Sequence, residues 1–285
     1  MRALITGGGG QLASDLHSRL GDQAVTLSRA ELDITDVAAV DRAFDTAQPD
    51  VVFNCAAYHN LDQCEANPAR SFAVNVEAVR NLALRGAKLV HVSTNYVFDG
   101  RRPEPYGEAD LPSPRSIYAI SKLAGEYAAL GYGSDALVVR TGGLYGLHGS
   151  ASKGGNFIQR MLARAREQDS LQVVSDQFLQ PTYTGDLADA LLDAVRRDAG
   201  GTVHLTASDA CSWHQFTEAI MEIAGVDIPV KPAETVVAPG GIDRPLNGVL
   251  ARPRADALGL AALPGWRDGL ERYMAEAGLA AQRTI

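Results

Sequence analysis

Short apolar runs alternate with segments of helical periodicity through the first two thirds of the chain. The apolar runs have the length of buried parallel strands and lie at residues 3–5, 24–27, 51–53, 88–92 and 136–140. The segments between them repeat apolar residues every three or four positions and predict helices over 11–20, 36–47, 69–85 and 116–130. Asp36 is a natural N-cap for the second helix. This alternation predicts an α/β fold with a doubly wound parallel sheet.

The rhythm becomes less regular after about residue 145. Helices are predicted over 156–167 and 184–197, and strands over 171–174 and 202–205. Two further helical stretches follow Trp213, on either side of a segment rich in Pro and Gly. We therefore expect a sheet domain of residues 1–146 plus about 168–206. A smaller, mixed α/β domain for substrate would comprise about 147–167 plus 207–285.

A glycine-rich loop, TGGGGQLA at residues 6–13, follows the first strand and opens the first helix. Gly7 permits a tight turn, Gly10 lets the backbone approach a pyrophosphate, and Ala13 is small enough for close packing of the helix on the strand. The N-terminus of the helix then supplies N–H donors and a favourable dipole. In this context the loop predicts a Rossmann-type dinucleotide site.

The end of the second strand bears on the choice of cofactor. An acidic residue there binds the ribose 2′-hydroxyl of NAD, whereas arginine suits the 2′-phosphate of NADP. Ser28 and Arg29 therefore favour NADP, and a solvent-facing Arg29 is the alternative. Asp33 follows closely; it could meet the adenine amino group or serve a turn.

Tyr118 and Lys122 stand four residues apart on one face of a predicted helix. A nearby cation favours the phenolate form of a tyrosine and so brings its pKa closer to neutrality. Thr94 follows the fourth strand, at the sheet edge where ligands of such folds bind, and could hydrogen-bond a substrate oxygen. Ser93 is the alternative to Thr94. These residues suggest acid–base catalysis by a tyrosine.

Composition and charge narrow the class of partner. The chain has 285 residues and a net charge of −8, which argues against nucleic acid or an anionic membrane as the main partner. No secretory signal core and no apolar run of membrane-spanning length is present in the sequence, so the cytoplasm is the expected compartment. The three cysteines and the histidines lack metal-ligand spacing, and no protein metal site is predicted.

Residues 93–100 (STNYVFDG) and 118–126 (YAISKLAGE) resemble the extended short-chain dehydrogenase/reductases, and among these the dTDP-4-dehydrorhamnose reductase family. The resemblance continues along most of the chain, at 54–58, 72–76, 140–141, 145–146, 176–177, 180–187, 244–247 and 266–270. It implies NADPH-dependent reduction of the C4 ketone of a nucleotide-activated 6-deoxyhexose, with Thr94, Tyr118 and Lys122 as the catalytic group and Tyr118 as the proton donor. Some relatives use Mg²⁺, and a homodimer is left open.

The resemblance also assigns binding residues. The cofactor would lie against Tyr118, Lys122 and a further set: Gly7, Gly10, Gln11, Leu12, Asp33, Ile34, Ala56, Ala57 and Tyr58. Ser28 and Arg29 join this set from their place at the end of the second strand. The sugar nucleotide would meet Thr94, Asn95, Tyr96, Phe98, Tyr118 and Arg244.

The chain departs from the family pattern at three places. Asn95 stands where many members have Asp, Gly143 stands where Trp is common, and His59 follows Tyr58 where small residues are frequent. Two other functions remain as alternatives. One is an epimerase or dehydratase that returns the hydride to its product. The other is a non-catalytic, NADP-binding regulatory subunit like that of methionine adenosyltransferase.

Overall fold

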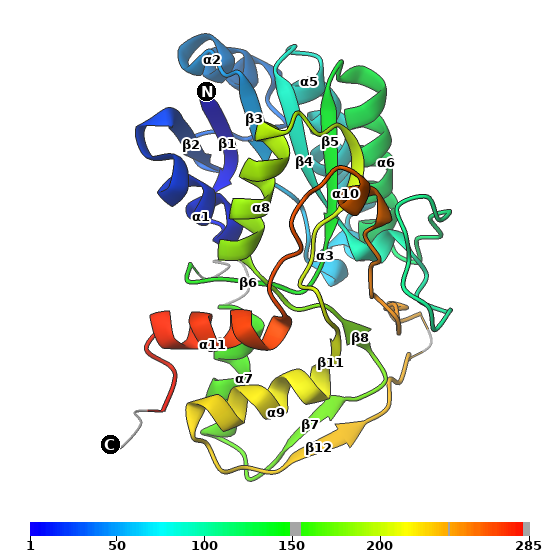
Figure 1. Cartoon of the computed structure of the whole chain (residues 1–285). Helices are drawn as coiled ribbons and strands as arrows, with labels where there is room; N and C mark the ends of the chain where they lie inside the picture. The colour runs from blue at the N-terminus through cyan, green and yellow to red at the C-terminus, as the bar shows by residue number, and fades with distance from the viewer. Residues whose placement is uncertain (149–154, 239, 282–285) are drawn as a thin grey trace.

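The computed structural model describes residues 1–148, 155–238 and 240–281. Within these residues a parallel sheet of six strands forms the centre of the larger unit, in the order β10-β5-β4-β3-β1-β2 (Figure 1). Its strands are β1 (Ala3–Gly8), β2 (Ala24–Ser28), β3 (Val51–Asn54), β4 (Lys88–Thr94), β5 (Ala136–Thr141) and β10 (Gly201–His204). The chain turns outward from β1 to β2 and then crosses back to β3. This topological switch point opens a crevice beside the carboxyl end of β1.

Helices cover both faces of this sheet. One face packs against α1 (Gln11–Leu20), α8 (Thr184–Arg196) and α10 (Pro253–Ala257). The other face packs against α2 (Val37–Ala47), α5 (Ala78–Ala83) and α6 (Ile117–Tyr132). Because both faces are buried, the strands are largely apolar, and the polar residues among them, such as His91 on β4 and Arg140 on β5, are themselves buried. The predicted α/β fold with a doubly wound parallel sheet is confirmed.

A second unit lies below the carboxyl ends of the strands (Figure 1). Its apolar cluster is built on Tyr145, Phe216 and Tyr273. The helices are α7 (Phe157–Ala165), α9 (Trp213–Ala224) and α11 (Trp266–Glu276), and the strand pairs are β7 (Leu171–Val174) with β12 (Val230–Ala233), β8 (Phe178–Leu179) with β11 (Cys211–Ser212), and β6 (Leu144–Tyr145) with β9 (Thr182–Tyr183). The sequence analysis placed residues 171–174 with the large sheet. Here β7 pairs instead with β12, because its side chains complete the second cluster.

The segment predicted as one helix over 69–85 is interrupted. It consists of α4 (Pro68–Phe72), a π-helical turn (Ala73–Glu77) and α5, preceded in the chain by the short α3 (Leu61–Ala66). The wider turn lets the Asn75 side chain bond both the N–H and the carbonyl of Tyr58, each at 2.9 Å, and also Ser121 Oγ at 2.9 Å. A π turn of this kind often marks a functional site.

Helix α6 buries charged side chains against the sheet. Ser116 caps its first turn, and Gly125 lets it approach the π turn so closely that a Cβ there would lie 2.1 Å from Asn75 O. Glu126, 1% exposed, accepts a hydrogen bond from Ser93 Oγ at 2.5 Å and pairs with Arg140 on β5 at 2.7 Å. The ion pair therefore fixes the rotation of α6 on β4 and β5.

Glu126→Gln should lower the free energy of unfolding by about 3–5 kcal/mol, because the Arg140 guanidinium would remain buried without its counter-charge. Chemical denaturation monitored by circular dichroism measures this. The matched control is Glu77→Gln, at an exposed position on the neighbouring π turn. Equal stability of the two variants would contradict the role of the ion pair.

Candidate active site

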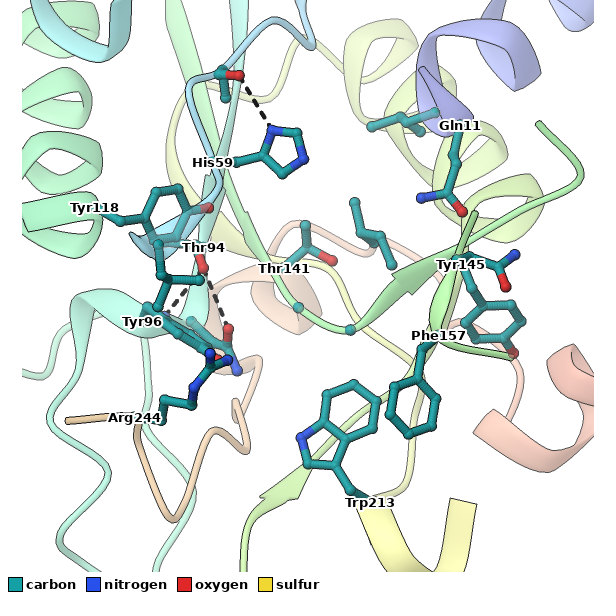
Figure 2. A pocket seen from close by; sticks show the side chains of 18 of the residues that line it. Gln11, His59, Thr94, Tyr96, Tyr118, Thr141, Tyr145, Phe157, Trp213 and Arg244 are labelled. Carbon is teal, nitrogen blue, oxygen red and sulfur yellow. Dashed lines mark hydrogen bonds between the residues drawn. The ribbon is translucent and has the colours of Figure 1, made fainter. Parts of the chain in front are cut away.

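A cavity of about 690 Å³ lies between the carboxyl ends of the large sheet and the second unit (Figure 2). The loop before α1, the ends of β4 and β5, helix α6 and helix α7 all contribute to its walls. Ten of the predicted site residues line it: Gly10, Gln11, Leu12, Ala57, Thr94, Asn95, Tyr96, Tyr118, Lys122 and Arg244. The fold thus brings together residues that are far apart in the sequence.

The glycine loop turns tightly at one end of this cavity. Gly7 has φ +76, and a Cβ on it would lie 2.8 Å from the Ala56 backbone nitrogen. Gly10 N donates to Gly7 O at 3.1 Å, and α1 begins at the next residue without a side-chain cap within the described residues. Gln11 Oε1 is buried there and has no hydrogen-bond partner in the described part of the chain. The free N–H groups at the start of α1 are suited to an anionic ligand, and the unpaired Gln11 oxygen is suited to a ligand group that donates a hydrogen bond.

The predicted adenosine residues are mostly engaged with protein. Asp33 accepts hydrogen bonds from Thr35 and pairs with Arg70 at 3.0 Å. The Thr35 hydrogen bond, helped by the Arg70 charge, lowers the pKa of Asp33 to about 2. This is the turn role that the sequence left as the alternative. Ile34 is buried in the core on the α2 side of the sheet. Neither residue lines the cavity.

Glu31 is a residue that sequence reasoning missed. Its carboxylate accepts hydrogen bonds from Ser28 N at 2.8 Å and from Ser28 Oγ at 2.7 Å, and the Ser28 hydrogen bonds lower the pKa of Glu31. Arg29 beside it is exposed. The strand end that was expected to offer only a hydroxyl and a cation therefore also carries a carboxylate.

Ala56, Ala57 and Tyr58 follow β3 and run beside the glycine loop. Ala57 lines the cavity, Ala56 touches Gly7, and Tyr58 is held by Asn75. His59 also lines the cavity, and its Nδ1 lies 3.3 Å from Ala57 O (Figure 2). The family departure at His59 thus lies in the cavity wall.

Thr94 and Tyr118 meet at the centre of the cavity (Figure 2). Burial raises the pKa of Tyr118, and the hydrogen bond with Thr94 acts in the opposite direction. We expected Lys122 to lower this pKa, but desolvation is the largest effect and the lowering effect comes from Thr94, so the phenol remains protonated. A protonated tyrosine is suited to act as a proton donor. Ser93, the alternative to Thr94, instead bonds Glu126.

Lys122 is one helical turn beyond Tyr118 and is 2% exposed. Its Nζ donates to Val92 O at 2.7 Å and lies 3.2 Å from His91 Nε2. Burial lowers the pKa of Lys122 to about 8, against the opposing charge of Glu126. A lysine that titrates this close to neutrality, inside a cavity, is typical of an active site.

The departures at Asn95 and Gly143 have structural causes. Asn95 Nδ2 donates to Gly248 O at 2.9 Å, a bond that a carboxylate could not make. Gly143 has φ +61, and a Cβ there would meet Leu179 at 2.9 Å and Pro181 at 3.0 Å. A tryptophan therefore has no room at position 143, and β8 covers this part of the cavity.

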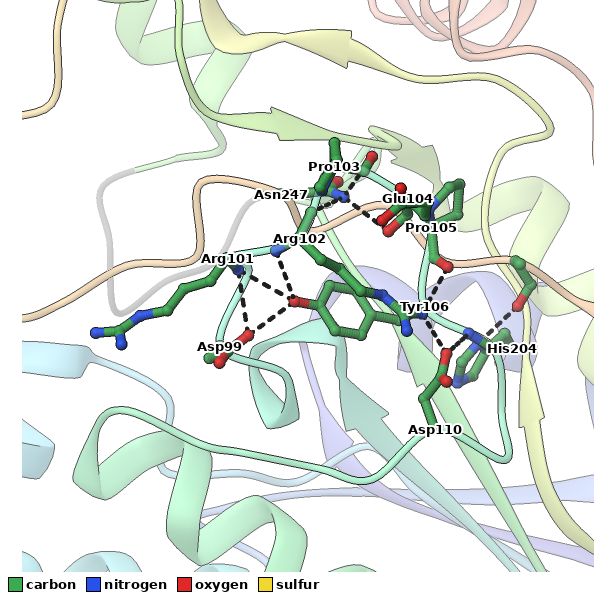
Figure 3. Close-up of polar contacts among 12 residues, drawn as sticks. Asp99, Arg101, Arg102, Pro103, Glu104, Pro105, Tyr106, Asp110, His204 and Asn247 are labelled. Atoms are coloured by element: carbon green, nitrogen blue, oxygen red, sulfur yellow. Dashed lines mark hydrogen bonds and ion pairs between the residues drawn. The ribbon is translucent and has the colours of Figure 1, made fainter.

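Phe98 was expected to shape the sugar pocket, but it does not line the cavity. It is 1% exposed and stacks on Tyr106, with ring centroids 4.4 Å apart. Tyr106 in turn bonds Asp99 and the backbone of Arg101, while Asn247 binds three carbonyls of the same loop (Figure 3). These contacts fix the loop of residues 99–106 against the segment that carries Arg244, and so hold that segment at the cavity.

The second unit adds residues that the sequence analysis did not assign to the site. Arg160 and Arg164 lie on α7 at i, i+4 spacing, and Phe157 and Trp213 have ring centroids 4.4 Å apart at the cavity wall (Figure 2). Thr141 Oγ1, at the end of β5, is buried in the wall without a partner among the described residues. The available signal was the spacing of Phe157, Arg160 and Arg164 along α7.

The described residues contain neither a cluster of metal ligands nor a helix able to span a membrane. Across the described ranges, no group of three or more His, Cys, Asp or Glu side chains is arranged to hold a metal ion. None of the helices in those ranges has the length and apolarity needed to span a membrane.

The family model for the RmlD substrate binding domain matches residues 1–278. The chain belongs to the dTDP-4-dehydrorhamnose reductase family. It is 37% identical over 287 residues to the dTDP-4-dehydrorhamnose reductase of Mycobacterium tuberculosis, covering 96% of this chain and 92% of that one. It is 35% identical over 278 residues to the dTDP-4-keto-6-deoxy-D-glucose reductase of Streptomyces niveus, covering 94% and 95%. The predicted resemblance is confirmed.

A solved structure of a relative is also similar over nearly the whole chain. The dTDP-4-dehydrorhamnose reductase of Bacillus anthracis, in complex with NADP, has a TM-score of 0.90 and 33% sequence identity, covering 96% of this chain and 98% of that one. At this similarity the two chains share the fold of the large sheet and of the second unit.

Asn95→Asp should lower the free energy of unfolding by about 1–3 kcal/mol, because the Gly248 carbonyl would lose its donor and face a carboxylate. Thermal unfolding of the purified variant measures this. Asn60→Asp is the matched control, since Asn60 accepts a hydrogen bond from Gln63 N as the cap of α3, and Asp caps equally well. The same loss in both variants would show that the Gly248 contact is not responsible.

Proposed function

We propose that this protein is an NADPH-dependent reductase that converts the C4 ketone of a nucleotide-activated 6-deoxyhexose to an alcohol. The observation that carries this proposal is the meeting of Thr94, Tyr118 and Lys122 in one cavity. The names of the relatives support the substrate class, and intact acid–base machinery favours catalysis over a purely cofactor-binding role.

The residues at the glycine loop fit a dinucleotide. The first turn of α1 offers backbone N–H groups to the phosphates, Gln11 offers an unpaired buried oxygen to a donor group, and Gly7 packs closely on Ala56, with no side chain between the loop and a ligand. The relative crystallised with NADP supports the same cofactor here. When bound, the nicotinamide supplies a hydride to the ketone carbon.

Tyr118 would supply the proton. As the carbonyl carbon gains a hydride, its oxygen becomes an alkoxide, and the phenol O–H protonates it. Thr94, which hydrogen-bonds Tyr118, would hold the carbonyl oxygen within reach of that proton. The Lys122 ammonium stabilises the phenolate that remains, because an opposite charge nearby favours the ionised form.

The second unit would bind the nucleotide end of the substrate. Arg160, Arg164 and Arg244 bring three guanidinium groups to the cavity wall, which suits a diphosphate. Phe157 and Trp213 present a joined aromatic surface suited to a nucleobase. This division puts recognition on the second unit and the chemistry on the sheet.

The purified protein should oxidise NADPH when a 4-keto-6-deoxy sugar nucleotide is added, and not with the free sugar, since the three arginines would lose their anionic partner. A panel of such nucleotides, followed by the loss of NADPH absorbance, measures this.

Tyr118→Phe should reduce turnover by a factor of about 10² or more while NADPH still binds, because only the proton donor is removed. An unchanged rate in that variant would refute the mechanism.

Glu31→Gln should improve the use of NADPH severalfold while leaving NADH nearly unchanged. The substitution removes a negative charge that competes with a 2′-phosphate for Ser28, and the amide keeps the size of the side chain. Initial rates with each cofactor measure the ratio of kcat/KM values. Arg29→Ala provides the opposite control, since it should weaken NADPH more than NADH. Equal changes for both cofactors would place the 2′-phosphate elsewhere.

A further inference from the structure

His91 is a fully buried histidine directly beneath Lys122, outside the expected catalytic group. It lies on β4 with no exposed surface. Its Nε2 lies 3.2 Å from Lys122 Nζ, and its Nδ1 lies 3.1 Å from the Asn54 side-chain amide. Asn54, also without exposed surface, is in turn 2.7 Å from Thr6 Oγ1, which lies 3.4 Å from Ala56 N at the glycine loop. A continuous polar chain thus connects Lys122 to the cofactor loop through the interior of the sheet.

The imidazole in this chain carries only one proton. Burial, with the Lys122 charge, holds the pKa of His91 well below its ordinary value, so the ring is neutral. A neutral imidazole has one N–H and one acceptor nitrogen. The Lys122 ammonium can only donate, so Nε2 must be the acceptor and Nδ1 must carry the proton. In the structure Asn54 Nδ2 faces His91 Nδ1, and Thr6 Oγ1 donates to Asn54 Oδ1, an arrangement that suits the Nε2–H tautomer. The Nδ1–H tautomer therefore requires the Asn54 amide to be turned over, so that its oxygen accepts from Nδ1–H and its NH₂ donates to Thr6 Oγ1.

We propose that His91 is a positioning residue for Lys122: its Nε2 accepts a hydrogen bond from the ammonium, and the ammonium selects the Nδ1–H tautomer against the preference of Thr6 and Asn54. With Val92 O as the other acceptor, two bonds fix the ammonium where it lines the cavity. The role of His91 in catalysis rests on the proposed function. The tautomer itself does not depend on any reaction.

The other ionisable groups near Lys122 come from α6, from β4 and from the loop after β3. Tyr118 and Glu126 are one turn away on α6, Cys55 follows β3, and His91 is on β4. Glu126 is already paired with Arg140, and burial raises the pKa of Cys55 to about 12, so its thiol remains neutral. His91 is therefore the neighbour whose substitution removes a direct bond to the ammonium without changing a charge.

The first test uses the pH profile of kcat/KM for sugar-nucleotide reduction. Activity should fall above pH about 8, where Lys122 loses its proton. His91→Leu removes the acceptor and should move this alkaline limb down by about one pH unit, the size expected for a hydrogen bond to a charged group. His91→Gln should keep the limb near the wild-type pH, because its amide oxygen can replace Nε2. An equal shift in both variants, or none in either, overturns the proposal.

The second test needs neither substrate nor cofactor. Nitrogen-15 NMR of the histidine rings should show His91 as the Nδ1–H tautomer in the whole protein at neutral pH, with the signal identified by its absence in His91→Gln. In Lys122→Met no ammonium selects the acceptor, and the ring should change to the Nε2–H tautomer. The same tautomer in both proteins overturns the proposal. The expected change, together with no turnover on any sugar nucleotide, would refute the proposed function and leave the contact between His91 and Lys122 established.

Discussion

The burial of two opposite charges on one face of α6 is the constraint on which the site depends. Lys122 and Glu126 are one turn apart and both face the sheet, where an unpaired charge would be severely unfavourable. Glu126 is neutralised by Arg140 on β5, and Lys122 is bonded by Val92 O and His91 on β4. Because the partners come from different strands, α6 can satisfy both charges in only one register. That register places Tyr118 at the end of β4.

The π turn before α5 follows from the same close packing. Gly125 brings α6 against the backbone of Asn75, and the wider turn directs the Asn75 side chain toward Tyr58 and Ser121. The loop after β3 is thereby held beside the glycine loop. The catalytic end and the cofactor end of the cavity are thus positioned by one set of contacts, through hydrogen bonds made inside the sheet domain.

Local patterns predicted the sheet, most of its helices and the glycine loop, because strand burial and helix periodicity are written in neighbouring residues. The spacing of Tyr118 and Lys122 and the strand-end position of Thr94 likewise predicted that the three would meet. The sequence left roles open or misplaced where a distant partner decides them. The pairing of Asp33 with Arg70 and the stacking of Phe98 on Tyr106 cannot be inferred from spacing alone. Similarly, β7 leaves the large sheet because its partner strand lies some sixty residues later in the chain.

An acidic chain that handles two anionic ligands appears contradictory until charge is considered locally. The net charge of −8 describes the whole surface, whereas a ligand in a cleft responds to the groups that line it. The cavity wall carries Lys122 at its buried end and Arg160, Arg164 and Arg244 at the second unit. Glu31 stands apart from the cavity, at the end of β2, where the bond with Ser28 holds its charge in place. Under the proposed function this distribution of charge separates the tasks: the buried Lys122 would act on the proton transfer, the three arginines would bind phosphate, and Glu31 would influence the choice between cofactors.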